Sequence, residues 1–159
     1  MSEAPREHKP AGETHVFLAQ LMHPADASFQ GNIHGGLIMR LIDEAAGTAA
    51  YRFCRRRVVT AHIDSIDFHH PVHVGDVVML KASVTYAGRT SMEIGVRVEA
   101  ENLATGEVLH TNSAYLVFVA LDQDGRPTPV PELLPETEDE RRRYAEAERR
   151  RARRTSAAD

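Results

Sequence analysis

Residues 31–47 read GNIHGGLIMRLIDEAAG, in which an amide, a histidine and two glycines lead directly into an apolar helical pattern. At about 100° per residue, the apolar side chains of residues 37–53 share one broad arc, which predicts a long helix buried along that arc. Asp43 lies at the border of the arc among small residues, whereas Glu44 points away and has Arg40 as an i,i+4 ion-pair partner. An aspartate at such a border either hydrogen-bonds within a core or stays reactive as a base, and both roles are open at this point.

The predicted start of this helix consists of two glycines, which have no side chains. Gly35 and Gly36 expose the backbone where the first N–H groups of a helix have no intrahelical acceptor. Such groups suit a developing oxyanion, although glycines also allow close packing between a helix and a strand. Asn32 is placed either to hold a water or polarise a carbonyl, or to cap the helix. His34 is placed to touch a substrate or to pack within the turn.

Runs of β-branched and apolar residues on both sides of the helix predict a sheet. The segment THVFLAQLM before the helix is expected to form the first strand. The face of residues 92–100 that carries charges is expected to be wet or to line a site. Short connections of hairpin length separate the last three strands. The four strands expected after the helix cover residues 58–68, 77–87, 92–100 and 108–120.

One strand, one long helix and four antiparallel strands indicate an α+β hotdog fold, in which a curled sheet wraps around the central helix. A helix of about 18 residues spans roughly 27 Å, which matches the width of such a sheet. The exposed edges and the open face of a lone sheet predict at least a dimer. We expect the domain to cover residues 13–134, with a flexible polar arm over 1–12 and a charged C-terminal helix and tail over 135–159.

Length and charge limit the partners of the chain. At 159 residues it suits one domain, and its net charge of -4 provides no overall positive field for nucleic acid or an anionic membrane. Acidic residues lead and arginines trail in residues 136–154, which predicts a solvated helix. No apolar run approaches the roughly 18 residues of a membrane span, and the N-terminus has no signal-peptide core. We therefore expect a cytoplasmic protein without nucleic-acid or membrane partners.

The sequence gives little support for a metal-binding site or for a cysteine nucleophile. His69 and His70 are expected on opposite faces of a strand, and no cysteine accompanies the histidines of this segment, so no metal site is expected. Cys54 has no paired histidine nearby, which argues against a cysteine nucleophile. No phosphate loop or dinucleotide fingerprint occurs, and we expect no cofactor.

Several motifs in order carry a family resemblance. The stretch GNIHGGLIMRLIDEAAG, then VVTAHIDSIDFHHPVHVGD, AGRTSMEI, AYLVFVALDQDGRPTPVPELLPET and DERRRY resemble the hotdog-fold acyl-CoA thioesterases of the bacterial YciA type and the cytosolic, brain-type acyl-CoA hydrolases. The resemblance runs from about residue 16 to residue 144. It implies hydrolysis of acyl-CoA to a fatty acid and CoA at a dimer interface, often in a trimer of dimers, a homohexamer.

The resemblance also implies roles for individual residues. It makes Asp43 and Asn32, contributed by opposite subunits, the catalytic pair. It further implies that Thr60, Arg89, Thr90 and Ser91 contact the pantetheine or nucleotide part of CoA. From their place at the helix start, Gly35 and His34 are also expected to contact the substrate. Coenzyme A enters only as part of the substrate and product.

The expected chemistry fits these residue types. A thioester has an electrophilic carbonyl and a thiol leaving group with a pKa near about 8.5, so a base, a water and an oxyanion site suffice. We expect Asp43 to deprotonate a water or to attack as a nucleophile, while Asn32 and the Gly36 N–H hold the carbonyl oxygen. Two alternatives stay open: a non-enzymatic acyl-CoA sensor or interaction module, and a hotdog hydroxyacyl dehydratase that uses His34.

Overall fold

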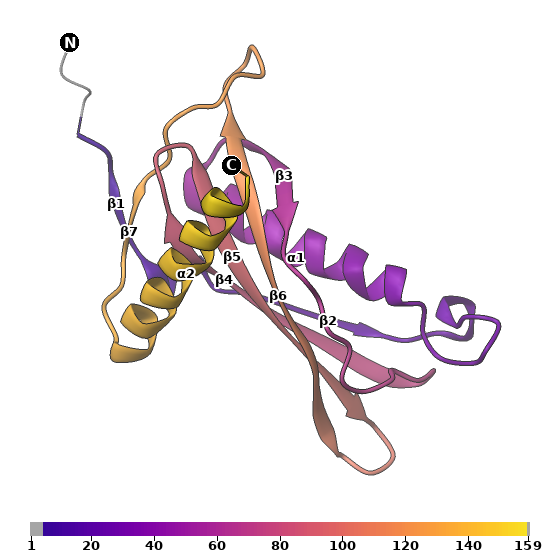
Figure 1. Cartoon of the computed structure of the whole chain (residues 1–159). Helices are drawn as coiled ribbons and strands as arrows, with labels where there is room; N and C mark the ends of the chain where they lie inside the picture. Colours follow the sequence, from indigo (N-terminus) through magenta and orange to yellow (C-terminus); the bar gives the residue numbers. More distant parts are fainter. Residues whose placement is uncertain (1–4, 159) are drawn as a thin grey trace.

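The computed structural model describes residues 5–158. A long helix, α1 (Gly35–Cys54), lies across one face of a curled five-stranded sheet (Figure 1). The strand order is β2-β4-β5-β6-β3, and every neighbouring pair is antiparallel. This architecture confirms the predicted α+β hotdog fold. The strands of this sheet are β2 (Val16–Leu21), β3 (Arg57–Ile63), β4 (Asp76–Ala87), β5 (Ser91–Asn102) and β6 (Val108–Leu121).

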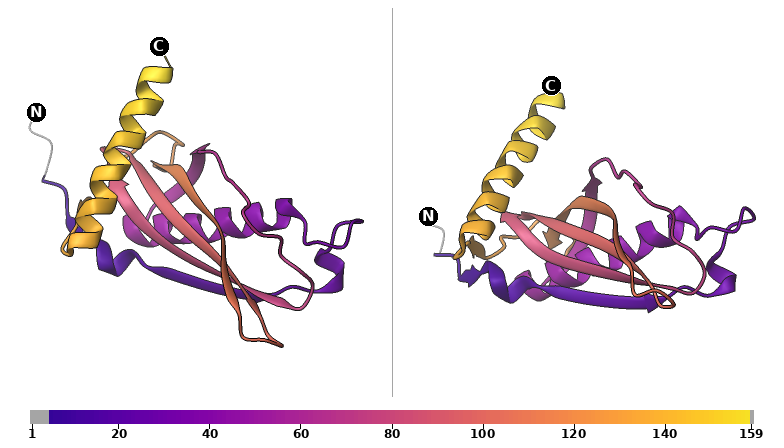
Figure 2. Two further views of the ribbon diagram at one scale, coloured as in Figure 1. Left: turned by 60° about the horizontal axis from the view of Figure 1, so that its bottom comes forward. Right: turned by 90° about the horizontal axis from the view of Figure 1, so that it is seen from below.

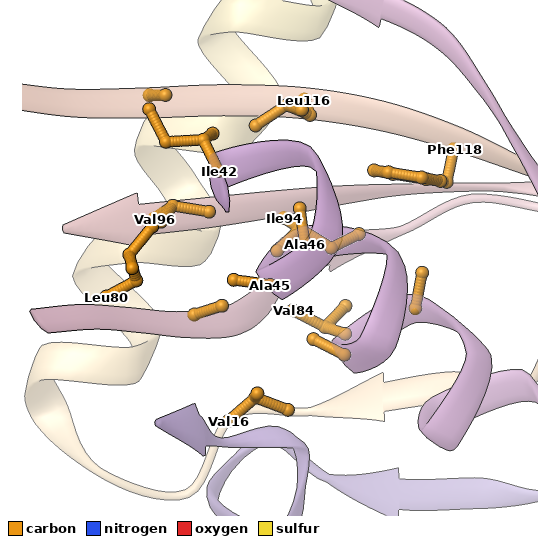
Figure 3. Packing of buried hydrophobic residues seen from close by; sticks show 14 of the residues in the cluster. Val16, Ile42, Ala45, Ala46, Leu80, Val84, Ile94, Val96, Leu116 and Phe118 are labelled. Atoms are coloured by element: carbon orange, nitrogen blue, oxygen red, sulfur yellow. The ribbon is translucent and has the colours of Figure 1, made fainter. Parts of the chain in front are cut away.

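The central helix buries the apolar arc that its sequence predicts. In Figure 3, Ile42, Ala45 and Ala46 of α1 face side chains of β4, β5 and β6. The helix begins two residues earlier than predicted and ends where Arg55 adopts a left-handed conformation with φ of 52°. Its buried side chains are Ile38, Leu41, Ile42, Ala45, Ala46, Ala49, Ala50, Phe53 and Cys54.

The strand predicted over residues 58–68 is shorter than expected. β3 ends at Ile63, and a β-bulge between Thr60 and His62 shifts the register of its pairing with β6. Beyond it, the chain stays near β6 through single backbone bonds, of which one joins the His69 N–H to the Thr111 carbonyl at 2.9 Å. The prediction of a strand up to residue 68 is therefore wrong beyond Ile63, and the edge of the sheet is irregular here.

The described part of the N-terminal segment is paired with the rest of the chain. β1 (His8–Pro10) forms a parallel pair with β7 (Glu132–Leu134), and a short 3-10 turn, η1 (Ala11–Thr14), follows. Lys9 Nζ also donates to the Phe53 carbonyl at the end of α1, at 2.9 Å. These contacts replace the flexible arm that the sequence suggests for residues 5–12; residues 1–4 lie outside the described part.

The charged C-terminal helix, α2 (Glu138–Ala157), packs on the face of the sheet opposite α1 (Figures 2 and 3). Its Ala147 is fully buried, and its Arg150 pairs with Glu93 of β5, which is only 1% exposed. The prediction of a solvated helix is therefore wrong for this side of α2. Neither α1 nor α2 has an apolar stretch long enough to cross a membrane.

Candidate active site

Asp43 and Thr60 meet between the central helix and the edge strand. Asp43 lies in the third turn of α1 and is half-buried. Thr60 lies on β3 opposite Phe118, whose side chain belongs to the core, so Thr60 faces the same side of the sheet as α1. Its Oγ1 donates a 2.7 Å hydrogen bond to Asp43 Oδ1. The sequence pointed to Thr60 only as a CoA contact, and its contact with Asp43 is a finding of the structure.

The second carboxylate oxygen of Asp43 has no hydrogen-bond donor among the described residues. Within residues 5–158, Asp43 Oδ2 accepts no hydrogen bond from the protein. Its neighbour Glu44 is exposed and pairs with Arg40 at 3.0 Å, which confirms the surface ion pair predicted for it. Of the two adjacent acids, Asp43 is therefore the one that a single hydroxyl orients while leaving an oxygen available for a proton.

The start of α1 is open, as a binding site for an anion requires. The N-cap is His34, and its side chain makes no capping hydrogen bond. A Cβ added at Gly36 would meet no atom within 4 Å, and one at Gly35 would lie 3.8 Å from the Phe68 ring, an ordinary contact. Close packing within the chain therefore does not explain Gly36. Within residues 5–158 the N–H groups of Gly35 and Gly36 donate to no acceptor, whereas the Leu37 N–H donates to the His34 carbonyl at 3.0 Å.

Asn32 does not cap the helix. Its carbonyl accepts the Ser28 N–H at 2.6 Å, and its backbone forms an isolated bridge with His73. Its side chain is exposed, and within the described part of the chain it makes no hydrogen bond. The short hydrogen-bonded turn thus holds the amide of Asn32 outward, just before the start of α1.

A single chain does not bring the predicted catalytic pair together. With a rise of 1.5 Å per residue, Asp43 lies about 12 Å along the axis of α1 from Gly35. Asn32 is three residues further away in sequence, beyond the N-cap. This separation exceeds any hydrogen-bonding distance, so the helix start and Asp43 of one chain do not act on the same carbonyl group.

The hairpin between β4 and β5 lies two strands from Thr60. Met92 pairs with Phe118, and Phe118 pairs with Thr60, so the strands alone set a separation of about 10 Å. Arg89 is exposed, and its carbonyl accepts the Val130 N–H at 2.9 Å. Thr90 and Ser91 are half-buried. The structure therefore does not bring the predicted CoA contacts of the hairpin against Asp43 within one chain.

The histidines and Cys54 considered above form neither a metal site nor a nucleophilic site in the described part of the chain. No group of His, Cys, Asp or Glu side chains within residues 5–158 is arranged to hold a metal ion. His62 pairs instead with Asp64, at 2.8 Å between Nε2 and Oδ1. Cys54 is buried, and this burial raises the pKa of its thiol, which disfavours the thiolate that a nucleophile needs.

Comparison with known proteins places the chain in a family. Residues 30–117 match the model of the thioesterase superfamily. The cytosolic acyl coenzyme A thioester hydrolase of Rattus norvegicus is 40% identical over 135 residues, which cover 84% of this chain and 35% of the rat protein. A structure of an apo-hexameric acyl-CoA thioesterase is 41% identical, with a TM-score of 0.92 over 96% of this chain and 97% of that one.

A third similar protein has been solved with ligands. The acyl-CoA hydrolase of Staphylococcus aureus, in complex with butyryl coenzyme A, coenzyme A and coenzyme A disulfide, is 35% identical with a TM-score of 0.85, over 95% of this chain and 94% of that one. Other structures of that enzyme carry alanine in place of an asparagine, an aspartate or a threonine. The chain described here belongs to the thioesterase superfamily, which confirms the resemblance found in its motifs.

Proposed function

We propose that this protein hydrolyses acyl-CoA thioesters to a free fatty acid and CoA, with Asp43 as the general base. The observation that carries the proposal is the 2.7 Å hydrogen bond from Thr60 Oγ1 to Asp43 Oδ1, in a chain whose similar proteins are acyl-CoA hydrolases. This bond orients the carboxylate and leaves Oδ2 to accept a proton. Alanine variants of the same three residue types in the Staphylococcus aureus enzyme support roles for Asn32, Asp43 and Thr60.

The reaction needs only groups that the chain provides. Asp43 Oδ2 accepts a proton from a water while the water oxygen bonds to the thioester carbonyl carbon, and the carbonyl electron pair moves onto oxygen. The amide of Asn32 and the Gly36 N–H donate to this oxyanion. When the C=O bond re-forms, the C–S bond breaks and the CoA thiolate leaves, taking up the proton released from Asp43. One water is consumed, and one carboxylic acid and one thiol are formed.

We propose that a second copy of the chain completes each site. Asp43 and the helix start of one chain are too far apart to share a substrate carbonyl, so Asn32 and Gly36 have to come from a partner. The free edge of β3 supplies a surface for this partner, because among the described strands β3 pairs with β6 alone. Both β3 and α1 also carry exposed apolar side chains: Met39, Tyr51, Val59 and Ile63.

Further features of the proposal concern the assembly and the rest of the substrate. A trimer of such dimers is supported by the similar hexameric thioesterase, and a cytoplasmic location by the similar cytosolic rat enzyme. The hairpin residues Arg89, Thr90 and Ser91 are proposed to contact the pantetheine or nucleotide part of CoA. Gly35 and His34 lie at the open start of α1, beside the proposed position of the carbonyl oxygen.

The test is release of free CoA thiol from acyl-CoAs of graded chain length. We expect wild-type turnover and a loss of at least about 100-fold in kcat for Asp43→Asn, the effect expected when a general base is removed. Glu44→Gln, which changes the adjacent surface acid, serves as the control and should keep full activity. Thermal unfolding of each variant checks the fold. Near-normal turnover of a folded Asp43→Asn protein would reject the proposed role.

Isotope labelling in a single turnover separates the base from a nucleophile. In water enriched in oxygen-18, direct attack of water places the label in the released fatty acid during the first turnover. An anhydride formed by Asp43 and opened by water at the Asp43 carbonyl would place the label in the protein carboxylate instead. We expect the label in the fatty acid and none in the peptide that contains Asp43.

A further inference from the structure

We propose that Arg154 of α2 is a positioning residue, which holds the bulged edge strand from the outer face of the sheet so that Thr60 meets Asp43 on the inner face. The inference rests on the proposed function of Asp43 and Thr60. It gives the C-terminal helix a role in catalysis although the helix lies on the opposite face of the sheet from α1.

The bulge places the side chains of Thr60 and His62 on opposite faces of the sheet. Thr60 pairs with Phe118, a core residue, but His62 pairs with Val117 on the next position of β6. The extra residue, Ala61, shifts the alternation by one. Thr60 therefore faces α1, while His62 lies on the outer face.

The residue after β3 is bound to α2. Asp64 Oδ2 accepts from Arg154 Nη1 at 3.0 Å, and Asp64 Oδ1 lies 2.8 Å from His62 Nε2. The side chains of Arg154 and Asp64 are only 20% and 24% exposed, so solvent screens this ion pair less than it screens a surface pair. A charge-assisted bond of this kind fixes the end of the strand more firmly than a neutral one.

Arg154 connects this end of the strand to a rigid point in the sheet. The same Nη1 lies 3.3 Å from Oε2 of Glu93, a buried side chain in β5. Arg150 contacts Glu93 at 2.8 Å, and Thr85 donates to its Oε1 at 2.7 Å, so Glu93 has several partners on both oxygens. The Arg150 guanidinium also stacks on Tyr115, 3.6 Å from its ring centroid.

Apart from Arg154, the end of β3 is held by its ladder pairs with β6, His62 with Val117 and Ile63 with Leu116, and by single contacts of Asp64. β3 is an edge strand, and its only described residue that is not exposed is Val58. Beyond the bulge, Asp64 is held to β6 by one backbone bond, from its N–H to the Tyr115 carbonyl at 3.0 Å. Because misplacement by about 1 Å can cost up to about 100-fold in rate, a looser strand end should lower turnover through Thr60.

The test compares kcat and KM of variants for an acyl-CoA that the wild-type enzyme hydrolyses. We expect Arg154→Ala to lower kcat about five- to tenfold with KM within twofold of wild type, an effect within the range for a misaligned catalytic group. Arg154→Lys, which keeps the charge, should recover part of the loss. Arg149→Ala removes the same charge from an exposed position of α2 and should leave both constants unchanged.

Two more variants show whether Arg154 acts through this path. Asp64→Ala, which leaves α2 intact, should lower kcat as much as Arg154→Ala does, and the double variant should lose no more than either single one. In a Thr60→Val protein, which lacks the hydroxyl, Arg154→Ala should have no further effect on kcat. Thermal unfolding measured beside the kinetics ensures that every assay is run on folded protein.

Each outcome decides the inference. Wild-type kcat in both Arg154→Ala and Asp64→Ala would overturn the inference. It would also be overturned if Arg154→Ala lowered kcat by the same factor in the Thr60→Val protein as in the wild type. If Arg154→Ala does not fold, Asp64→Ala and Arg154→Lys decide alone: a normal kcat in Asp64→Ala overturns the inference. A wild-type protein that releases no CoA would instead reject the proposed function, which keeps the two failures apart.

Discussion

The Thr60 hydroxyl donates a 2.7 Å hydrogen bond to Asp43 Oδ1, and so joins two residues that are 17 positions apart in sequence and lie on different elements. One comes from the middle of the central helix and the other from an exposed edge strand. The bond limits the orientations of the carboxylate without neutralising it. The catalytic consequences of this pair can be tested separately from the assembly of the site.

The first prediction concerns Thr60 itself. Thr60→Val keeps the shape of the side chain but removes the donor, so Asp43 loses its fixed orientation. We expect kcat to fall about tenfold, as for loss of a net hydrogen-bond contribution of about 1.4 kcal/mol in the transition state, with little change in KM. Thr48→Val is a matched control, because Thr48 is exposed on α1 and its hydroxyl donates to the Glu44 carbonyl of the same helix. Unchanged kcat in Thr60→Val would show that Asp43 needs no such partner.

A second prediction tests the shared site by complementation. Asp43→Asn and Asn32→Ala proteins should each be inactive alone, because each removes one member of every site. When the two are unfolded together and refolded as a mixture, half of the dimers contain both chains, and one of their two sites is intact. We therefore expect about a quarter of wild-type activity, as for random pairing of equal amounts of two chains. No gain over the separate proteins would place both residues in the same chain's site.

A third prediction concerns Gly36. A Cβ there meets no atom within 4 Å in the chain, so Gly36→Ala should not lower the melting temperature, and alanine favours the helix. The added methyl group would lie next to the Gly36 N–H, which is proposed to hold the oxyanion. We expect kcat to fall by about tenfold or more, in line with partial loss of an oxyanion donor. Gly12→Ala, at an ordinary 3.5 Å contact far from α1 in sequence, is the control for activity.

A fourth prediction concerns the buried ion pair under α2. Arg150→Ala removes the main partner of Glu93, which is only 1% exposed, and leaves this carboxylate with Arg154 and Thr85. Breaking such a pair should lower the free energy of unfolding by about 3 kcal/mol. In denaturant unfolding, Arg149→Ala should behave as wild type. Equal stability of the two variants would show that Glu93 does not depend on Arg150.

A fifth prediction uses the N-terminal cap of α2. Glu140 accepts backbone N–H bonds from Glu136 and Thr137, which lower the pKa of its carboxyl below the usual value. Because the folded pKa is lowered, the stabilisation is present above the unfolded pKa, near about 4.3, and is lost as pH falls through the folded pKa. Glu140→Ala should lower the melting temperature by about 2–4 °C at pH 7, the effect of losing a cap of about 1 kcal/mol.

The pH dependence provides the check on the cap. The difference in melting temperature between wild type and Glu140→Ala should shrink as pH falls below the unfolded pKa, near about 4.3, because the wild-type carboxyl becomes protonated as pH falls through its lowered pKa. Glu138→Ala, at an exposed residue of the same turn, should show no comparable difference at pH 7. A gap that stays constant from pH 7 to pH 3 would contradict the assignment of the effect to the charged form of Glu140.

Local patterns were enough to predict the central helix and most of the sheet. The apolar arc of residues 37–53 and the alternation of residues 77–87 and 92–100 are visible in the sequence, because they depend on the repeat of one helix or strand. The same arc singled out Asp43 over Glu44. The acyl-CoA chemistry followed from the resemblance of several motifs to a family and not from these patterns.

Only the tertiary structure shows how the site is held. The bulge at Ala61, the bond from Thr60 to Asp43 and the burial of Glu93 under Arg150 each depend on the register of strands and on contacts between distant segments. A charged stretch such as residues 136–154 has the same local pattern whether it faces water or a buried carboxylate. Sequence periodicity reports which side of an element is apolar, whereas the partner of each polar group is set by what the folded chain brings opposite it.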